Sequence, residues 1–599
     1  MERTELLNSV REYLEKHGFE AIIIPTQDPH FGEYTQQHFK VREWLSGFTG
    51  SAGTLVVTVK GAALWTDSRY FVQAESQLRG SAIHLMKMKI ALTPTIEQWL
   101  KGQCTYGASV AVDGTLFSVN EFEHLSNELE PECRLVAVKD PFSLLWHERE
   151  PLVFNPIVTM DSGHCGVASA EKFKMVKSAL GMEDGGRYVY YLTTCDDIAW
   201  LCNIRGSDIE YNPLALSYAL VTNSAIHLFV NLDSLTEEAR IQLTGDGVEI
   251  HPYNSIEEVM GQLTCDMVRM FNPDAISVAH YNIFVRPGCS VKTDTTPGGI
   301  VANLKSIKNN WEKEGFRRAF EADAVSWCKI LKGIEETIAS GAELTEYDVA
   351  KMFPAVRSEN EYYIGESFET IAAFGPNAAL PHYTATEENA SKITGNGFLL
   401  MDTGAHYSFG GTTDTTRTVP VGKLSYEQKK FYTLVLKGMI DLTLAKFPSG
   451  TRGASLDILA REPLYREAVM YYHGTSHGIG HTLCVHEGPQ SIRIEENPVT
   501  LKPGMIISNE PAIYFDGEYG IRTENVVMVE SWKFSKFNEF YCFNTLTLVP
   551  IATSCIVKEL LSAEEIEWLN AFHSQVYEKI SPLLDSEERL WLKKATEAI

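Results

Sequence analysis

Short apolar runs bounded by glycine and polar residues mark the first part of the chain. An amphipathic N-terminal segment predicts a helix. The runs Ala21–Ile24, Thr54–Val59 and Ala62–Trp65 predict strands. A glycine-punctuated stretch, Trp44–Gly53, lies between the first two of these strands. Helical and strand patterns that alternate in this way indicate an α/β domain.

A second segment repeats this plan. Tyr188–Leu192, Leu216–Val221 and Ala225–Val230 are strand-like. Both segments place a Trp-Leu pair shortly before a Gly-Ser step, with paired strands after it: Trp44-Leu45 before Gly50-Ser51, and Trp200-Leu201 before Gly206-Ser207. We interpret this as an internal duplication of one α/β domain; the alternative is a chance likeness between two α/β units.

A third segment begins near Ser306. Apolar residues at three- and four-residue steps predict one long helix that ends near Gly341: Phe316, Phe320, Ala324, Trp327, Leu331, Ile334 and Ile338. Strands mixed with helices follow, and the tail after Leu560 has a helical pattern. The predicted fold is therefore α/β throughout, with domains at 1–147, 148–305 and 306–599.

Charge and cysteine content exclude several classes of protein. The 78 acidic and 52 basic side chains give a net charge of −26, so the basic surface of a nucleic-acid binder is not expected, and binding to anionic membranes is not expected either. No apolar run is long enough to predict a transmembrane helix. The 11 cysteines include no CxxC pair, which argues against a zinc ribbon and favours reduced thiols in a cytoplasmic protein.

Four strand-like stretches of the third segment each lead to a carboxylate: Asp402, Asp414, Glu510 and Glu524. The stretch 519–527 predicts one strand with Arg522 and Glu524 on the same face. Buried carboxylates without partners are unfavourable, and divalent cations prefer their oxygens. Any one of these carboxylates alone could instead form a salt bridge or a helix cap. The four together predict a site for two divalent ions.

Histidines cluster in the same segment, at His473, His477, His481 and His486. His473 and His477 have the spacing of a helical zinc pair, but Gly474, Gly478 and Gly480 disfavour a helix there. The HExxH motif also needs a glutamate directly after its first histidine, where this chain has Gly474. A zinc protease of that type is therefore not expected.

In this order, Asp402, Asp414, His477, Glu510 and Glu524 resemble the metal set of the pita-bread metallopeptidases. Several flanking strings are similar to the proline-specific branch of that family: His473-Gly-Thr-Ser-His477-Gly-Ile-Gly, Val485-His486-Glu-Gly-Pro, Asn509-Glu510-Pro511, Gly520-Ile-Arg522-Thr-Glu524-Asn525, and Gly375-Pro-Asn377 with His382-Tyr383. The stretches 46–53 and 65–70 look like the first creatinase-N-like domain of the cytosolic three-domain aminopeptidase P, and 197–213 like its second. The resemblance covers the whole chain.

The resemblance implies a function and a role for each residue. Two divalent ions, Mn²⁺ first with Zn²⁺ or Co²⁺ as alternatives, would be bound by Asp402, Asp414, His477, Glu510 and Glu524. Glu510 would also accept a proton during hydrolysis of the Xaa-Pro bond. His382, His473 and His486 would bind substrate and assist catalysis. Arg522 would anchor Glu524 and nearby substrate groups, and Tyr514 would line the site. His481 matches no catalytic position of the family.

The implied enzyme is a cytoplasmic homodimer that removes the first residue from peptides with proline second. One rival is a prolidase, which would cleave only Xaa-Pro dipeptides; the long N-terminal part argues against it. The other rival is a non-catalytic binding module of the same fold. The presence of all five metal-ligand residues in the family's order argues against that module.

Overall fold

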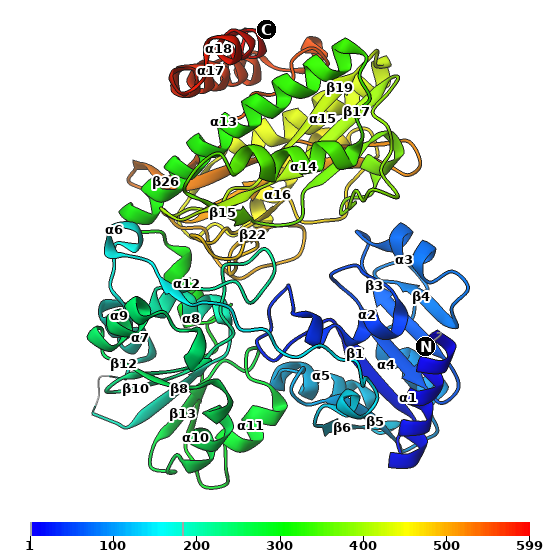
Figure 1. Cartoon of the computed structure of the whole chain (residues 1–599), viewed down its shortest axis with the longest axis vertical. Helices are drawn as coiled ribbons and strands as arrows, with labels where there is room; N and C mark the ends of the chain where they lie inside the picture. The colour runs from blue at the N-terminus through cyan, green and yellow to red at the C-terminus, as the bar shows by residue number, and fades with distance from the viewer. Residues whose placement is uncertain (1–2, 183–184) are drawn as a thin grey trace. The chain divides into compact units, whose positions relative to one another are not determined.

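The computed structural model describes residues 3–182 and 185–599 (Figure 1). By compactness the chain divides into two units. The first consists of Met1–Met160 and Val167–Val301, and the second of Asp161–Gly166 and Ala302–Ile599. Asp161–Gly166 belongs with the second unit, where the Asn309 side-chain amide donates to the Cys165 carbonyl at 2.9 Å. The three domain boundaries expected from the sequence stay a prediction.

Two six-stranded sheets form the framework of the first unit. The first has the order β4-β3-β2-β1-β5-β6 and the second the order β12-β11-β10-β8-β13-β14. Their strands are β1 (Ala21–Pro25), β2 (Thr54–Thr58), β3 (Ala62–Thr66), β4 (Ile83–Lys87), β5 (Ala108–Asp113) and β6 (Cys133–Val138), and then β8 (Tyr188–Leu192), β10 (Tyr218–Thr222), β11 (Ile226–Val230), β12 (Val248–Pro252), β13 (Val268–Phe271) and β14 (Val291–Thr293).

The same pairings recur in both sheets. β2 is antiparallel to β1 and β3, as β10 is to β8 and β11. The other three pairs of adjacent strands in each sheet are parallel. Identical order and orientation confirm the predicted duplication, because strand topology of this detail seldom recurs by chance.

Helices cover both faces of the first sheet. Residues of α1 (Arg3–His17) and α2 (Val41–Ser46) pack in one core with Ile22 and Ile24 of β1. Residues of α4 (Ile96–Gln103) and α5 (Val119–Leu129) pack in the other core with Ala21 and Ile23 of the same strand. Successive side chains of a strand point to opposite faces, so a strand that is apolar throughout, such as β1, requires both layers.

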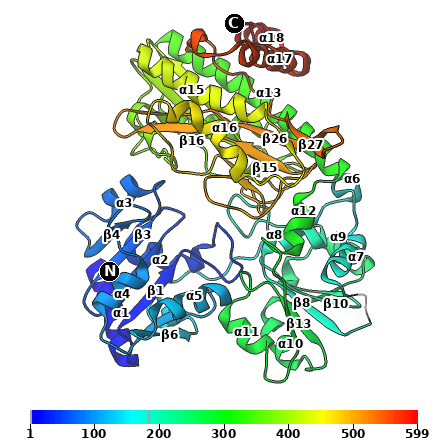
Figure 2. The same ribbon diagram turned by 180° about the vertical axis from the view of Figure 1, so that it is seen from behind.

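One long helix, α13 (Asn310–Ser340), runs through the second unit. Asn309 and Glu312 form a capping box at its start, and Gly341 ends it with a φ of 74°. The helix predicted from the apolar stripe is therefore confirmed. The C-terminal helices α17 (Ala563–Ile580) and α18 (Ser586–Ala595) pack beside α13, as both views show (Figure 1, Figure 2), and the helical tail is confirmed as well.

Two larger sheets and several further helices also belong to this unit. A three-stranded sheet has the order β16-β17-β19, and a four-stranded sheet the order β20-β27-β26-β23. Their elements and the packed helices are β16 (Ile371–Phe374), β17 (Gly397–Thr403), β19 (Thr415–Val421), β20 (Lys446–Pro448), β23 (Ile506–Asn509), β26 (Asn525–Phe534), β27 (Glu539–Thr545), α12 (Ile300–Ser306), α14 (Glu346–Arg357), α15 (Tyr426–Thr443) and α16 (Ala454–Tyr465). The α/β class predicted for the third segment is confirmed.

Cys265 and Cys289 form a disulfide, and the other nine cysteines, all among the described residues, are not disulfide-bonded. The expectation of reduced thiols is wrong for this pair. The two residues come shortly before the neighbouring parallel strands β13 and β14, which brings their Cα atoms to 4.5 Å. Among the described residues, no helix is both long and apolar enough to span a membrane.

Alanine substitutions at two helix glycines should change the stability of the protein in opposite directions. A Cβ at Gly438 of α15 would lie 2.2 Å from the Ala460 carbonyl oxygen, whereas one at Gly333 of α13 meets nothing within 4 Å. Gly438→Ala should therefore lower the free energy of unfolding by about 1–3 kcal/mol through overpacking. Gly333→Ala should raise it by up to about 1 kcal/mol, because alanine has the higher helix propensity. Urea unfolding of the two variants measures this, and equal effects would contradict the packing argument.

Candidate metal centre

Five chain segments bring the predicted ligands together. Asp402 lies on β17, and Asp414 directly precedes β19; the register pairs Asp402 with Thr416. His477 ends the short strand β21 (Ser476–His477), and Glu510 directly follows β23. Glu524 lies between β25 (Tyr519–Arg522) and β26.

The side chains of these residues form one cluster. Ligand atoms of Asp414, His477 and Glu524 lie within 4.8 Å of one another. The His477 Nε2 atom is 3.5 Å from Asp414 Oδ2 and 3.3 Å from Glu510 Oε1. Asp402, Asp414 and Glu524 are buried, and Glu510 is partly buried. The structure thus brings the five residues into one largely buried site.

The single strand expected over 519–527 is wrong. β25 ends at Arg522 and pairs with β24 (Ala512–Phe515), whereas β26 starts at Asn525 and pairs with β23. The backbone between them bonds elsewhere, since Glu524 N–H donates to the Thr416 carbonyl at 3.2 Å. This break places Glu524 beside β19, between two sheets.

The electrostatics of the cluster fit divalent cations. Burial raises the pKa of Glu524 well above its ordinary value, and the neighbouring Asp414, Glu510 and Asp402 add to that shift. Burial likewise raises the pKa of Asp402 to about 6, although Arg522 opposes the shift. Asp402 Oδ1 and Glu524 Oε1 are buried and have no hydrogen-bond partner among the described residues. Buried, mutually repelling oxygens of this kind are suitable ligands for hard cations.

His477 is oriented as a ligand. Its Nδ1 lies 3.0 Å from the Gly478 carbonyl oxygen, which can only accept, so Nδ1 carries a hydrogen. Nε2 therefore faces Asp414 and Glu510 with a lone pair, unless a proton or cation lies between them. Burial lowers the pKa of His477, but its bonds to the two carboxylates outweigh burial and raise the pKa well above the ordinary value. The cluster therefore attracts positive charge to this nitrogen.

A hydrogen-bonded chain leads away from the carboxylates. The Arg522 guanidinium donates to Asp402 Oδ2 and, at 2.6 Å, to the Tyr514 hydroxyl oxygen. The Tyr514 hydroxyl lies 3.1 Å from His473 Nε2, while His473 Nδ1 donates to the Gly474 carbonyl at 2.8 Å. His473 Nε2 is thus the acceptor, and burial lowers the pKa of this imidazole to about 4.

We expected Arg522 to bind Glu524 directly, but the two side chains are connected through Thr416 instead. The Arg522 Nε donates to the Thr416 hydroxyl at 3.1 Å, and that hydroxyl donates to Glu524 Oε2 at 2.9 Å. The break after Arg522 separates the two side chains, so Thr416 connects them. No sequence pattern marked Thr416.

The other two predicted histidines lie in loops. The His486 ring meets the His477 ring edge to face, with centroids 4.4 Å apart, so it borders the cluster. His382 follows the 3₁₀ helix η5 (Gly375–Ala379), and η5 lies against β25 at Gly520. His481, which matched no catalytic position, is buried beside Phe316 of α13.

Sequence reasoning missed two buried ion pairs that hold these loops. Arg461 of α16 bonds Asp457 at 2.6 Å and donates to the carbonyl oxygens of Tyr471 and His473. Lys308 bonds Glu487, the neighbour of His486, at 2.6 Å, and both side chains are almost fully buried. The i, i+4 spacing of Asp457 and Arg461 in an apolar helix was a usable signal. Lys308 and Glu487 are far apart in sequence and gave none.

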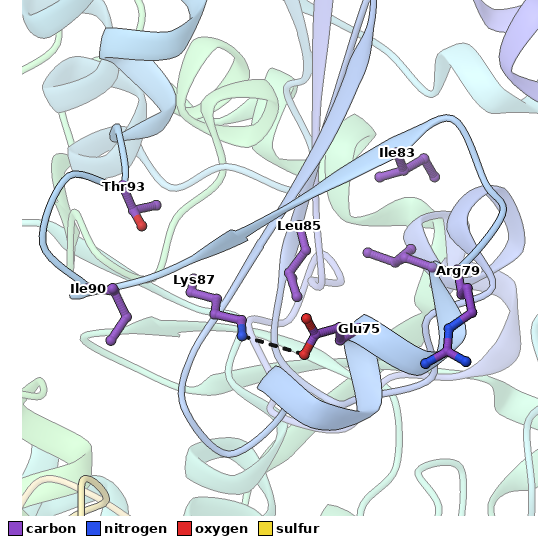
Figure 3. A pocket seen from close by; sticks show the side chains of 8 residues that line it. Glu75, Arg79, Ile83, Leu85, Lys87, Ile90 and Thr93 are labelled. Atoms are coloured by element: carbon purple, nitrogen blue, oxygen red, sulfur yellow. Dashed lines mark ion pairs between the residues drawn. The ribbon is translucent and has the colours of Figure 1, made fainter.

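A separate hollow of about 350 Å³ lies in the first unit (Figure 3). It is lined by α3 (Phe71–Gln77), β4 and the segments next to them, and the Lys87–Glu75 ion pair of 3.5 Å crosses it. None of the predicted site residues line it: the residues are Glu75, Leu78, Arg79, Ile83, Leu85, Lys87, Ile90 and Thr93.

Family models match nearly the whole chain. Residues 314–531 match metallopeptidase family M24, and 539–599 match the C-terminal region of peptidase M24. The Creatinase/Prolidase N-terminal domain matches twice, at 7–145 and at 148–312. These matches agree with the predicted fold class of two creatinase-N-like domains before a pita-bread metallopeptidase domain.

Individual relatives align over the full length. A probable Xaa-Pro aminopeptidase P from Coprinopsis cinerea is 36% identical and covers 100% of this chain and 99% of its own. Aminopeptidase P2 of Arabidopsis thaliana is 35% identical over 98% of this chain and 87% of its own. A solved X-prolyl aminopeptidase from Caenorhabditis elegans, described as a cytosolic enzyme with a di-nuclear active site, has a TM-score of 0.94 at 34% identity and covers 100% of both chains.

Removing Lys308 should destabilise the protein much more than removing an exposed lysine. Lys308→Met leaves the Glu487 charge buried without its closest partner, which costs about 3–5 kcal/mol. Lys392→Met breaks an ion pair with Glu343 in which both side chains are more than half exposed, and should cost less than about 1 kcal/mol. Urea unfolding of both variants compares the two costs. Similar losses of unfolding free energy in the two variants would show that burial does not strengthen the Lys308–Glu487 pair.

Proposed function

This chain belongs to the aminopeptidase P family of the M24 metallopeptidases, and we propose that it removes the N-terminal residue from peptides whose second residue is proline, with two divalent ions at the cluster of Asp402, Asp414, His477, Glu510 and Glu524. The observation that carries the proposal is that cluster: four carboxylates and one imidazole, from five segments, largely buried against one another.

The two ions would supply Lewis-acid polarisation of the scissile carbonyl and a nucleophile at neutral pH. Asp402 would hold one ion, His477 and Glu510 the other, and Asp414 and Glu524 both. Formal charge supports two ions, because four carboxylates balance two divalent cations. Glu510 is the most accessible of the four by side-chain exposure, at 18%, which suits a group that also accepts a proton from the attacking water.

The remaining side chains would bind substrate and move protons. His473 Nε2 points to the Tyr514 hydroxyl, so a neutral His473 can accept a proton or turn to donate one to a developing oxyanion. His486, beside His477, and His382, in the loop after η5, would orient the substrate and enclose the proline ring. Arg522 fixes Asp402 and Tyr514 and in this way positions both the ligand set and the substrate side.

The chemistry of proline explains why a specialised peptidase is needed for this bond. The Xaa-Pro bond has no amide hydrogen, and the ring restricts the residue before it, so peptidases that rely on ordinary amide geometry cleave it poorly. A site that recognises the ring by shape avoids that requirement.

We further propose Mn²⁺ as the metal, since four carboxylates and one imidazole form an oxygen-rich ligand set; Zn²⁺ and Co²⁺ stay alternatives. A cytoplasmic location is supported by the C. elegans relative, which is described as cytosolic. The homodimer follows from the family resemblance, and gel filtration tests it.

Incubation of the purified protein with Mn²⁺ and three peptides tests the proposal. Arginine should be released from Arg-Pro-Pro, not from Arg-Ala-Ala, and the release should stop with a chelator. Release from the dipeptide Arg-Pro alone would instead identify a prolidase. No release from any of them, together with no bound metal, would favour the non-catalytic binding module.

Loss of the Tyr514 hydroxyl should slow catalysis without loss of metal. Tyr514→Phe removes the group between Arg522 and His473, and one such hydrogen bond corresponds to about a tenfold fall in kcat/KM on Arg-Pro-Pro. Tyr472→Phe is the matched control, because Tyr472 is 67% exposed. Equal kcat/KM for the two variants, at equal metal content, would remove Tyr514 from the site.

A further inference from the structure

A second cluster of metal-ligand side chains lies in the first unit, on the second sheet. His227 of β11 and Glu249 and His251 of β12 each offer a ligand atom, and these atoms lie within 4.8 Å of one another. His227 Nδ1 is 3.2 Å from His251 Nε2 and 3.2 Å from Glu249 Oε2. None of the three belongs to the catalytic cluster described above.

The two 3.2 Å distances are close to those between ligands of a tetrahedral zinc site. Zinc bonds nitrogen and carboxylate oxygen at about 2.0–2.2 Å, so two ligands of a tetrahedral site are about 3.3–3.5 Å apart. We propose that His227, Glu249 and His251 form a Zn²⁺ site, with water as the fourth ligand. Two histidines and one glutamate form a known three-ligand zinc set.

The register of the strands arranges this set. β11 and β12 are parallel, with His227 opposite Glu249 and Phe229 opposite His251, so all four side chains share one face of the sheet. The buried Phe229 ring stacks on the His251 ring, with centroids 4.9 Å apart, and so fixes its orientation.

The duplicated sheet gives an internal comparison. If β3 and β4 are superposed by register on β11 and β12, Ala63, His84 and Met86 occupy the places of His227, Glu249 and His251. The shared fold therefore does not by itself require metal ligands at these positions. His84 is exposed on the edge strand of its sheet and provides a matched control.

A bound ion would have a structural effect. β12 is the edge strand of its sheet, and the ion would link it to β11 through side chains as well as through backbone hydrogen bonds. Edge strands are the parts of a sheet most in need of such protection. The inference does not depend on the proposed peptidase activity.

Zinc stoichiometry tests the site. The full-length protein and its variants are dialysed against the same micromolar free Zn²⁺ in Mn²⁺-containing buffer, and bound zinc is measured by mass spectrometry. Exchange at the catalytic cluster is the same in every sample, so differences report on this site. His251→Ala and His227→Ala should each bind one Zn²⁺ per chain fewer than the wild type, whereas His84→Ala should bind as many.

A second measurement needs no variant. Zn²⁺ should protect His227 and His251 of the wild type, but not His84, from modification by diethyl pyrocarbonate, as read by peptide mass spectrometry. Equal zinc content in all four proteins, or equal modification with and without Zn²⁺, would overturn the proposal. Arginine release from Arg-Pro-Pro by His251→Ala, measured on the same samples, separates failure of this site from failure of the proposed activity.

Discussion

The mutual repulsion of four carboxylates around one imidazole is the constraint on which the catalytic unit depends. Asp402, Asp414 and Glu524 are buried, and Glu524 in particular has its pKa raised by its acidic neighbours as well as by burial. Such a group of charges is stable only if cations or protons neutralise it. The fold therefore has to hold the carboxylates close together against their mutual repulsion. Cation binding and the integrity of the site are consequently linked.

The structure meets this demand with hydrogen bonds from rigid elements. Arg522 donates to the Asp402 carboxylate on one side of the cluster. On the other side, Thr416 of β19 donates its hydroxyl to the Glu524 carboxylate and accepts the Glu524 N–H at its carbonyl. Arg417, fully buried, donates to the Glu524 carbonyl and so fixes the break between β25 and β26. Buried charged residues hold the histidine loops. Arg461 donates to the His473 carbonyl oxygen, and Glu487, the neighbour of His486, pairs with Lys308. Ligands lie on or next to strands, whereas the histidines proposed to contact substrate lie in loops.

Local patterns predicted what depends on local sequence. The apolar stripe from Phe316 to Ile338 predicted α13, and the apolar runs of the first unit predicted β1, β2, β3, β8, β10 and β11. The glycines around His477 correctly argued against a helix, since β21 and loops occupy that stretch. The strand break after Arg522 was missed because residues 519–527 have a continuous strand pattern. At the break the backbone bonds Thr416 and Pro511, and both residues lie outside this segment. The partner of Arg522, the roles of Thr416 and Lys308, and the Cys265–Cys289 pair depend on tertiary contacts for the same reason.

The two ligand clusters of this chain differ in burial, and therefore in how well their charges are stabilised without a cation. Asp402 has a side chain 12% exposed, next to other buried acids, so its charge has little water to stabilise it. The Glu249 side chain is 58% exposed and pairs with His227, which in turn lies within hydrogen-bond distance of His251. Water and a hydrogen bond stabilise that cluster adequately when it is empty. The proposed catalytic cluster would therefore require its ions, whereas the cluster on β11 and β12 would accept an ion without depending on one. This difference in solvation suits one site to chemistry and the other to an adjustable structural link.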